Sequence, residues 1–265
     1  MKPSLLLCLP ALALGASSLN AAVLYDFNSE VSDAFFSSDI SGWSQDIANP
    51  TPFGAEAPMA YVADASIVGG VATGTGYLGT LRVNQAPHAT TSITGDLSAA
   101  GTMSGYSLSM NFGILDNTSD PYTTRDSFSI AVTDSTTATL GMLSITPTVG
   151  DVNLWDLSVV GGTGSVTVDV NSGYVLFITF LDDAVKFSYG SAASGVGSIE
   201  IGEVAASVSG DFGSLVLTHT PDASEALGTS ANALIFDNIA VVPEPGTALL
   251  CGVAALGLMR RRRVA

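Results

Sequence analysis

Apolar and polar residues alternate along most of the chain between residues 23 and 242. The alternation is clearest in four segments, which are residues 106–112, 127–132, 165–170 and 185–189. In one of them Phe128, Ile130 and Val132 are separated by a serine and an alanine. Because successive side chains of a β-strand point to opposite faces, this pattern predicts strands with one face on a core and one in water. We count about twelve such segments and no amphipathic helix.

Residues 174–181 differ from this pattern, because their sequence YVLFITFL is apolar throughout. A strand that is apolar at every position is typical of a central strand buried on both faces. Turn-forming residues, among them Gly161-Gly162 and Asp182-Asp183, separate the segments. Many short strands between such turns predict an all-β fold, with a single jelly-roll-like β-sandwich over residues 22–242.

The two ends of this predicted sandwich are expected at residues 23–27 and 233–242. The stretch Phe236-Asp237-Asn238-Ile239 resembles the closing strand of jelly-roll carbohydrate-binding and concanavalin-like domains. In those folds the first and last strands often lie side by side, so the resemblance implies the same here. Residues 44–58 contain prolines and polar residues and are expected to form a surface loop after Trp43. That loop is either a plain connection or one wall of a ligand groove.

The charges are distributed unevenly along a chain whose formal net charge is −16. Residues 22–242 hold 23 acidic residues against three basic ones, Arg82, Arg125 and Lys186. Such a body repels phosphate backbones, which excludes nucleic acid as a partner. Cys8 and Cys251 both lie outside the body, so it has neither a disulfide nor a thiolate metal site.

Residues 1–21 have the order of a secretory signal peptide. Lys2 is followed by an apolar run at 5–16 and a polar segment at 17–20, with cleavage expected near residue 21 or 22. The apolar run is too short to span a bilayer of ~30 Å as a helix. The alternative interpretation is an ordinary buried helix.

Residues 243–265 have three parts in a fixed order. Pro243-Glu244-Pro245 should end the last strand, because proline lacks the N–H that a β-ladder needs. Residues 247–259 are uncharged and mostly apolar, and as a helix they would extend ~20 Å. The chain then carries four consecutive cations, which favour the cytoplasmic side of a membrane. These are Arg260, Arg261, Arg262 and Arg263.

This combination closely resembles the PEP-CTERM protein-sorting signal. The resemblance covers about a tenth of the chain and implies that residues 243–245 are the recognition motif, residues 246–259 a transmembrane helix and the arginines the stop signal. It further implies transient tethering to the inner membrane of a Gram-negative bacterium. An exosortase would then process the tail and deliver the body to the cell surface or extracellular matrix.

Residues suited to catalysis are few. His88 and His219 have no spacing that pairs them as metal ligands, and we expect both at the surface or at strand ends. Glycoside hydrolysis needs two carboxyl groups roughly 5 to 10 Å apart. Glu200 and Glu203, three apart on a strand, should point to opposite faces, and the pair Asp182-Asp183 fits a turn.

Calcium and sugars are the ligands that the remaining residues could take. Oxygen atoms of loop acids suit Ca²⁺, although the same acids could simply be solvated. The candidates for a structural calcium site are Asp182, Asp183 and Asp237. Exposed aromatic side chains stack on sugars, whereas buried ones pack in the core. The candidates for glycan contact are Trp43, Tyr122 and Trp155.

The sequence therefore predicts an exported, non-enzymatic surface or matrix protein that needs no cofactor. Its expected partners are an exosortase and, transiently, the inner membrane. The alternative is a carbohydrate-binding module that engages exopolysaccharide, and the least favoured alternative is a polysaccharide-active enzyme.

Overall fold

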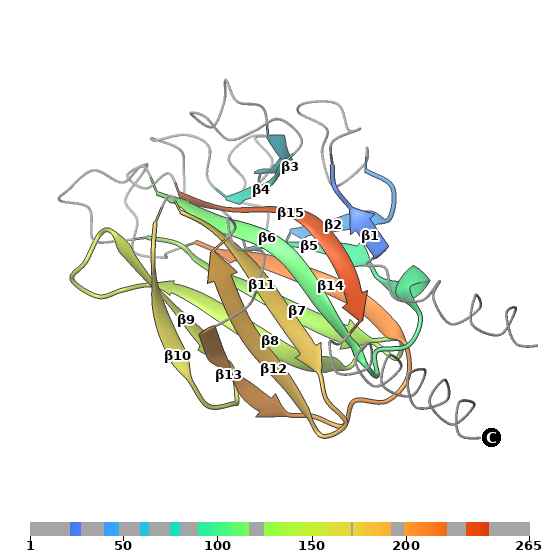
Figure 1. Cartoon of the computed structure of the whole chain (residues 1–265). Helices are drawn as coiled ribbons and strands as arrows, with labels where there is room; N and C mark the ends of the chain where they lie inside the picture. Colours follow the sequence, from blue (N-terminus) through green and yellow to red (C-terminus); the bar gives the residue numbers. More distant parts are fainter. Residues whose placement is uncertain are drawn as a thin grey trace, which may run out of the picture.

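The computed structural model describes residues 22–27, 40–47, 59–63, 75–79, 90–116, 125–170, 172–191, 199–221 and 232–243. Within these ranges the chain forms fifteen β-strands, one short 3-10 helix, η1 (Ser98–Ala100), and no α-helix (Figure 1). The predicted all-β fold is confirmed, with more strands than the alternation indicates. No helix in those ranges is long and apolar enough to cross a membrane. The predicted signal peptide and the predicted membrane segment lie outside the described residues.

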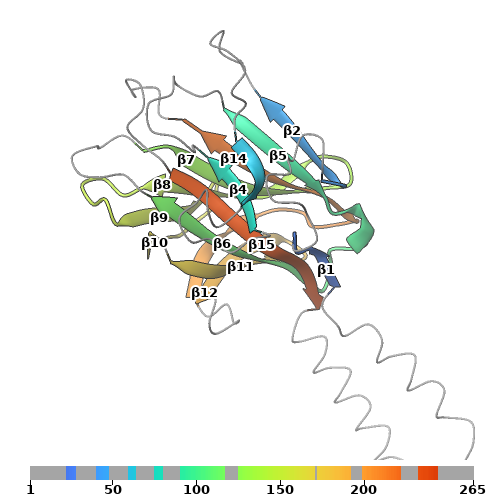
Figure 2. The same cartoon turned by 90° about the horizontal axis from the view of Figure 1, so that it is seen from above.

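The strands form two antiparallel sheets that pack face to face (Figures 1 and 2). Sheet A has the order β13-β12-β11-β6-β15-β4-β3, with β1 also paired to β15. Its strands are β1 (Ala22–Tyr25), β3 (Met59–Ala63), β4 (Thr75–Gly79), β6 (Tyr106–Asp116), β11 (Gly173–Phe180), β12 (Ala184–Ser191), β13 (Ile199–Ala205) and β15 (Asn232–Pro243). Sheet B has the order β10-β9-β8-β7-β14-β5-β2. Its strands are β2 (Trp43–Ile47), β5 (Thr91–Asp96), β7 (Ser127–Asp134), β8 (Thr139–Pro147), β9 (Leu154–Val159), β10 (Ser165–Asp169) and β14 (Phe212–Thr220).

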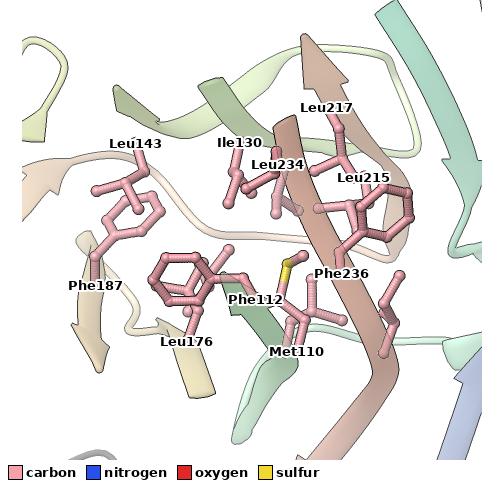
Figure 3. Close-up of a cluster of buried hydrophobic side chains, with 14 of the residues drawn as sticks. Met110, Phe112, Ile130, Leu143, Leu176, Phe187, Leu215, Leu217, Leu234 and Phe236 are labelled. Carbon is pink, nitrogen blue, oxygen red and sulfur yellow. The ribbon is translucent and has the colours of Figure 1, made fainter. Parts of the chain in front are cut away.

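The core lies between the sheets and is built from the inward positions of both (Figure 3). Sheet A contributes Leu176, Phe187 and Leu234, and sheet B contributes Ile130 and Leu143, all fully buried. Burying one such side chain is worth about 1.5–3 kcal/mol, which explains why the period-two pattern determines which face of each strand points inward. The sandwich predicted from that pattern is confirmed.

Strand β11 has the central position that its apolar sequence predicts, because it pairs with β6 on one side and β12 on the other. Leu176 and Ile178 on its inward face are fully buried. Phe177 and Thr179 on its outward face are only half-buried. The prediction of burial on both faces therefore holds on the outward face at Val175, which is 8% exposed, and fails at Phe177 and Thr179. In the described part of the chain only sheet B packs against sheet A, and it covers one face.

The first and last strands lie side by side, as the resemblance to jelly-roll domains implies. In β1, Ala22 lies opposite Val241 and Val23 lies opposite Ala240 of β15. Figure 2 shows β1 beside the final part of β15. The chain therefore enters and leaves the sandwich at the same place, and β15 ends at Pro243.

The first four residues of the surface loop expected at residues 44–58 are part of a strand instead. Residues 44–47 belong to β2, an edge strand that pairs with β5. Trp43 points into the core, whereas Ser44 and Asp46 are exposed. The polar residues that suggested a loop are the solvent-facing positions of this edge strand. Residues 48–58 lie outside the described ranges.

The margin of the sandwich at β13 is tied to sheet B through main-chain contacts. Thr163, in the β9–β10 turn, and Glu203 of β13 exchange two backbone hydrogen bonds of 3.0 and 3.1 Å. Gly164 has a φ of +104°, and a Cβ there would collide with the carbonyl oxygen of Ile201. A Cβ at Gly202 would collide with the carbonyl oxygen of Thr163. The missing side chains of Gly164 and Gly202 therefore allow two backbones from different sheets to meet.

Candidate functional site

Five polar side chains are buried together at one end of the sandwich, and we call them the polar cluster. They are Asp116, Arg125, Asp126, His219 and Asn232. Asp116 ends β6 and lies opposite Asn232, the first residue of β15. Arg125 and Asp126 directly precede β7, and the antiparallel pairing of β14 with β7 brings His219 to the same end.

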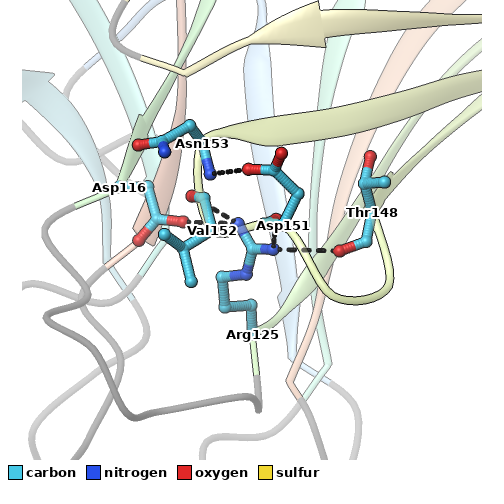
Figure 4. A network of polar contacts seen from close by, with 6 residues as sticks. All are labelled: Asp116, Arg125, Thr148, Asp151, Val152 and Asn153. Atoms are coloured by element: carbon cyan, nitrogen blue, oxygen red, sulfur yellow. Dashed lines mark hydrogen bonds and ion pairs between the residues drawn. The ribbon is translucent and has the colours of Figure 1, made fainter.

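Arg125 holds the turn between β8 and β9 (Figure 4). Its Nη1 donates to Asp116 Oδ2 at 3.0 Å and to the carbonyl of Val152 at 2.9 Å. Its Nη2 donates to the carbonyls of Asp151 and Thr148 at 2.6 and 3.3 Å. One guanidinium therefore satisfies three main-chain acceptors and one carboxylate, a task that suits its planar fork of donors.

The surroundings of this guanidinium explain why it is stable in the interior. The side chains of Arg125 and Asp116 are 4% and 2% exposed, so each charge compensates the other out of water. The Cζ atom of Arg125 also lies 5.3 Å from the centre of the Trp155 ring, a cation–π arrangement. The clamp fixes a turn whose tip, Val149, is 99% exposed.

His219 lies next to the end of β14, as the strand-end alternative expects, but it is buried and not at the surface. Its Nε2 lies 2.7 Å from Asp126 Oδ2, and its ring stacks on Phe128 at 5.4 Å between centroids. The amide of Asn232 donates to the same carboxylate at 3.2 Å and accepts from the Asp126 N–H at 3.1 Å. His219 has the same parity as the inward Leu217, and that spacing was the sequence signal for its burial.

The contacts of the polar cluster hold strands together. Asp126 and His219 are at most 2% exposed, so a substrate cannot reach the pair. The described contacts connect the starts of β7 and β15 to the ends of β6 and β14. Sequence reasoning missed the cluster because its members come from four separate segments whose proximity depends on strand pairing.

The two tryptophans proposed as glycan platforms lie in the core. Trp155 is completely buried, and Trp43 is 8% exposed. The Trp43 ring meets Phe27 and Phe236 at 5.9 Å between centroids, and it fits because Gly95 has no side chain in its way. Neither indole can stack on a sugar, so the core alternative holds for both. Tyr122, the third candidate, lies outside the described ranges.

The three acids proposed for calcium are not brought together. Asp182 and Asp183 are exposed in the turn between β11 and β12, as their sequence predicted. Asp237 is in the middle of β15. Within the described ranges, no three His, Cys, Asp or Glu side chains group closely enough to hold a metal ion. These acids therefore provide no shared set of calcium ligands.

Asp237 nevertheless has an unusual environment. Burial raises the pKa of Asp237 to about 6, the Asn238 N–H opposes that rise by donating to the carboxylate, and nearby Asp26 adds to it. The hydrogen bond from Asn238 N to Asp237 Oδ1 is 2.7 Å long. The pairing of β15 with β6 shifts register just after Asp237, and Asn238 has a φ of +50°.

Glu200 and Glu203 point to the same face, contrary to the prediction of opposite faces. They lie opposite Ser188 and Lys186 of β12, which are two residues apart. A register shift between these pairs acts as a β-bulge and restores the common direction. Both glutamates are exposed, and Glu200 forms a 2.5 Å ion pair with Lys186. Local spacing alone could not reveal the bulge.

The predicted sorting tail is described only at its first residue. Pro243 is the last residue of β15, opposite Tyr106, so the strand continues one residue further than the proline break predicts. A proline at a strand end loses little, because its missing N–H comes where pairing stops. Glu244, Pro245 and the four arginines lie outside the described ranges, as does His88.

The chain matches no protein-family model and no curated protein. Solved structures with a related arrangement include an endo-1,3-beta-glucanase from Streptomyces sioyaensis. The two are 13% identical with a TM-score of 0.49, over 86% of this chain and 98% of the glucanase. The CBM2 module of the evolved Dit protein of Lactobacillus casei BL23 phage J-1 is 14% identical with a TM-score of 0.45, over 83% and 97%.

A third similar structure is the winged bean acidic lectin in complex with methyl-α-D-galactose. It is 8% identical with a TM-score of 0.43, over 76% of this chain and 98% of the lectin. All three TM-scores are below 0.5. The assignment of a jelly-roll-like sandwich therefore rests on the two sheets and their pairing.

Proposed function

We propose that this chain is an exported, non-enzymatic protein of the cell surface or extracellular matrix, sorted by an exosortase through its C-terminal tail. The observation that carries the proposal is the ordered combination of the motif at 243–245, an apolar stretch and four arginines at the chain end. Any one of these parts is common, whereas their order at a terminus is specific.

The position of the first and last strands supports this proposal. β1 begins at Ala22, directly after the predicted signal peptide, and β15 ends at Pro243. Cleavage next to Ala22 and beyond Pro243 would therefore leave all fifteen described strands in place. Because β1 pairs with β15, both cleavage points would also lie on the same side of the body.

The non-enzymatic part of the proposal rests on the surroundings of the candidate groups. The side chains of the buried histidine–aspartate pair are at most 2% exposed. Glu200, on the edge strand β13, forms an ion pair with Lys186 of β12. Glu203 of β13 lies opposite the same lysine. Turnover of polysaccharide that disappears in Glu200→Gln or Glu203→Gln would instead support an enzyme.

The sorting proposal is tested with tail variants in the producing bacterium. Deletion of residues 260–263, or Pro245→Ala combined with Pro243→Ala, should leave an unprocessed, membrane-associated chain. Pro221→Ala, a proline change just after β14, serves as the control and should be processed normally. Cell fractionation and the mass of the recovered chain provide the readout. Normal processing and delivery of both tail variants would contradict the proposal.

Carbohydrate binding is the second candidate function. It is favoured by the outward face of sheet B, which is rich in serine and threonine and whose strands contain no lysine or arginine. A surface of this kind offers hydrogen-bond donors and acceptors without positive charge, and its acidic members include Asp46 and Asp156. Retention of the purified chain on matrix polysaccharide, compared with a matched resin without polysaccharide, tests this candidate. No retention on any polysaccharide would contradict it.

A further inference from the structure

A row of small hydroxyl side chains crosses sheet B almost from edge to edge. Each member lies directly opposite the next across neighbouring strands, and beyond β5 the row ends at Asp46 of β2. The hydroxyl row consists of Ser165, Ser158, Ser144, Ser129, Thr218 and Ser92. With strands ~4.8 Å apart, the full width from β10 to β2 is roughly 29 Å.

The hydroxyl row faces away from the core. Its neighbours along the strands, such as Ile130, Leu143 and Leu217, are fully buried on the inward face. The row residues themselves are half-buried or exposed. Ser92 and Thr218 hydroxyls lie 2.8 Å apart, so adjacent members also orient each other. The hydroxyls are therefore a surface feature and not part of a buried network.

An apolar row runs beside the hydroxyl row on the same face. Met142, Ala131 and Val216 lie opposite one another on β8, β7 and β14. Each is two residues along its strand from a member of the hydroxyl row, which places it on the same side of the sheet. On the other flank, Thr167 donates to Asp156 at 2.8 Å. The face thus combines a line of polar groups with a parallel line of apolar ones.

The composition of this face limits the partners that it could bind. None of the seven strands of sheet B contains lysine or arginine, so a polyanion would find no counter-charge. A membrane surface needs a larger apolar face with basic flanks. Protein interfaces favour aromatic, methionine and arginine side chains and are depleted in serine. A neutral polymer with its own hydroxyl groups fits the remaining chemistry.

We propose that the outward face of sheet B binds a neutral, extended polysaccharide that lies along the hydroxyl row. This inference rests on the carbohydrate-binding candidate and names its surface. An extended polysaccharide advances by one sugar over nearly the distance between adjacent strands. Successive sugars can therefore each meet one hydroxyl, while their C–H groups lie over the half-buried side chains of Met142 and Val216. Many weak contacts in register add up along such a polymer.

The test compares two triple variants of the full-length chain. Ser129→Ala, Ser144→Ala and Ser158→Ala together remove three adjacent hydroxyls of the row. The control removes three hydroxyls elsewhere, through Ser188→Ala, Ser207→Ala and Ser209→Ala. Both are measured by affinity electrophoresis and pull-down on cellulose and an unbranched β-1,3-glucan as neutral polymers, with alginate as the anionic comparison.

Wild type and the control should bind at least one neutral polymer, with weak or no binding to alginate. The row variant should lose about tenfold or more in affinity, because three hydrogen bonds are removed. Ser129→Lys, which adds a long side chain over the row, should have the same effect if the triple variant does not fold. Equal binding by the row variant and the control would overturn the inference and leave the carbohydrate-binding candidate standing.

Three other outcomes would overturn the inference as well. If the wild type binds no neutral polysaccharide, both the inference and the carbohydrate-binding candidate fail. If alginate binds as strongly as the neutral polymers, the charge argument is wrong. If the chain binds ice crystals but no polysaccharide, the ligand of the hydroxyl row is ice and not a polysaccharide. Because binding is measured on purified protein, none of these results depends on sorting in the cell.

Discussion

The Nε2 atom of His219 lies 2.7 Å from Oδ2 of Asp126. Both side chains are buried at one end of the sandwich and are almost inaccessible to water. The pair links the end of β14 to the residue that precedes β7. The Asn232 amide, at the start of β15, bonds to the same carboxylate and so ties in a strand of the other sheet. Three strands from two sheets therefore share one buried acid.

We predict that His219→Leu lowers the free energy of unfolding by about 3 kcal/mol or more, because it leaves Asp126 buried with too few partners. Adding Asp126→Asn to His219→Leu should recover part of the loss, since the uncompensated charge is then gone. Urea denaturation of the wild type, both single variants and the double variant gives the coupling. Additive losses would show that the two side chains do not interact.

Arg125→Met should destabilise the protein by about 3–5 kcal/mol, because Asp116 loses the charge that compensates its own and three main-chain carbonyls lose a hydrogen-bond donor. Arg125→Lys should be intermediate, since an ammonium group cannot reproduce the planar fork. Hydrogen exchange should accelerate first at the β8–β9 turn, residues 148–153. Unchanged exchange there in Arg125→Met would contradict the proposed clamp.

Gly95→Val should cost about 2 kcal/mol or more and disturb the aromatic cluster around Trp43. A Cβ at residue 95 would lie 2.7 Å from the Trp43 ring, so the indole must move. A red-shifted tryptophan emission together with a lower melting temperature would report this movement. Combining Gly95→Ala with Trp43→Leu should relieve the clash, and persistent strain in that double variant would refute the explanation.

The pH dependence of stability should carry the signature of Asp237. Its pKa in the folded protein is raised to about 6 from an ordinary 3.8, so the folded state binds this proton more tightly than the unfolded state. The resulting stabilisation is complete below about pH 4 and is lost as the pH rises through 6. Because the side chain is only half-buried, solvent screening limits the effect to about 1 kcal/mol.

Asp237→Asn removes this titration and provides the matched comparison. The variant should gain stability relative to the wild type between pH 4 and 7, by up to about 1 kcal/mol. Chemical denaturation at several pH values in that window measures the difference between the two curves. A constant difference across the whole window would mean that Asp237 titrates alike in the folded and unfolded states.

Much of the fold could be predicted from the sequence because one physical rule governs it. Phe128, Ile130 and Val132 must face the core, and the alternation of side chains then fixes the rest of the strand. The adjacent first and last strands were implied by the resemblance of residues 236–239 to jelly-roll closing strands.

The parts that sequence reasoning missed depend on pairing between distant segments. His219 is polar by type but shares the inward parity of Leu217, and its burial is tolerable because Asp126 Oδ2 lies 2.7 Å from its Nε2. Glu200 and Glu203 share a face because a bulge changes the pairing of β13 with β12. The edge strand β2 resembles a loop because its outward residues are polar. None of these features is visible in local spacing.

The last strand of the described residues, β15, occupies the middle of a sheet. β15 lies between β6 on one side and β4 and β1 on the other, although it is made after all of them. Sheet A therefore cannot close, and much of the core cannot form, until residue 243 has been synthesised. Contacts between such distant segments slow folding. During synthesis, the strands that pair with β15 therefore lack their partner until this strand has been made.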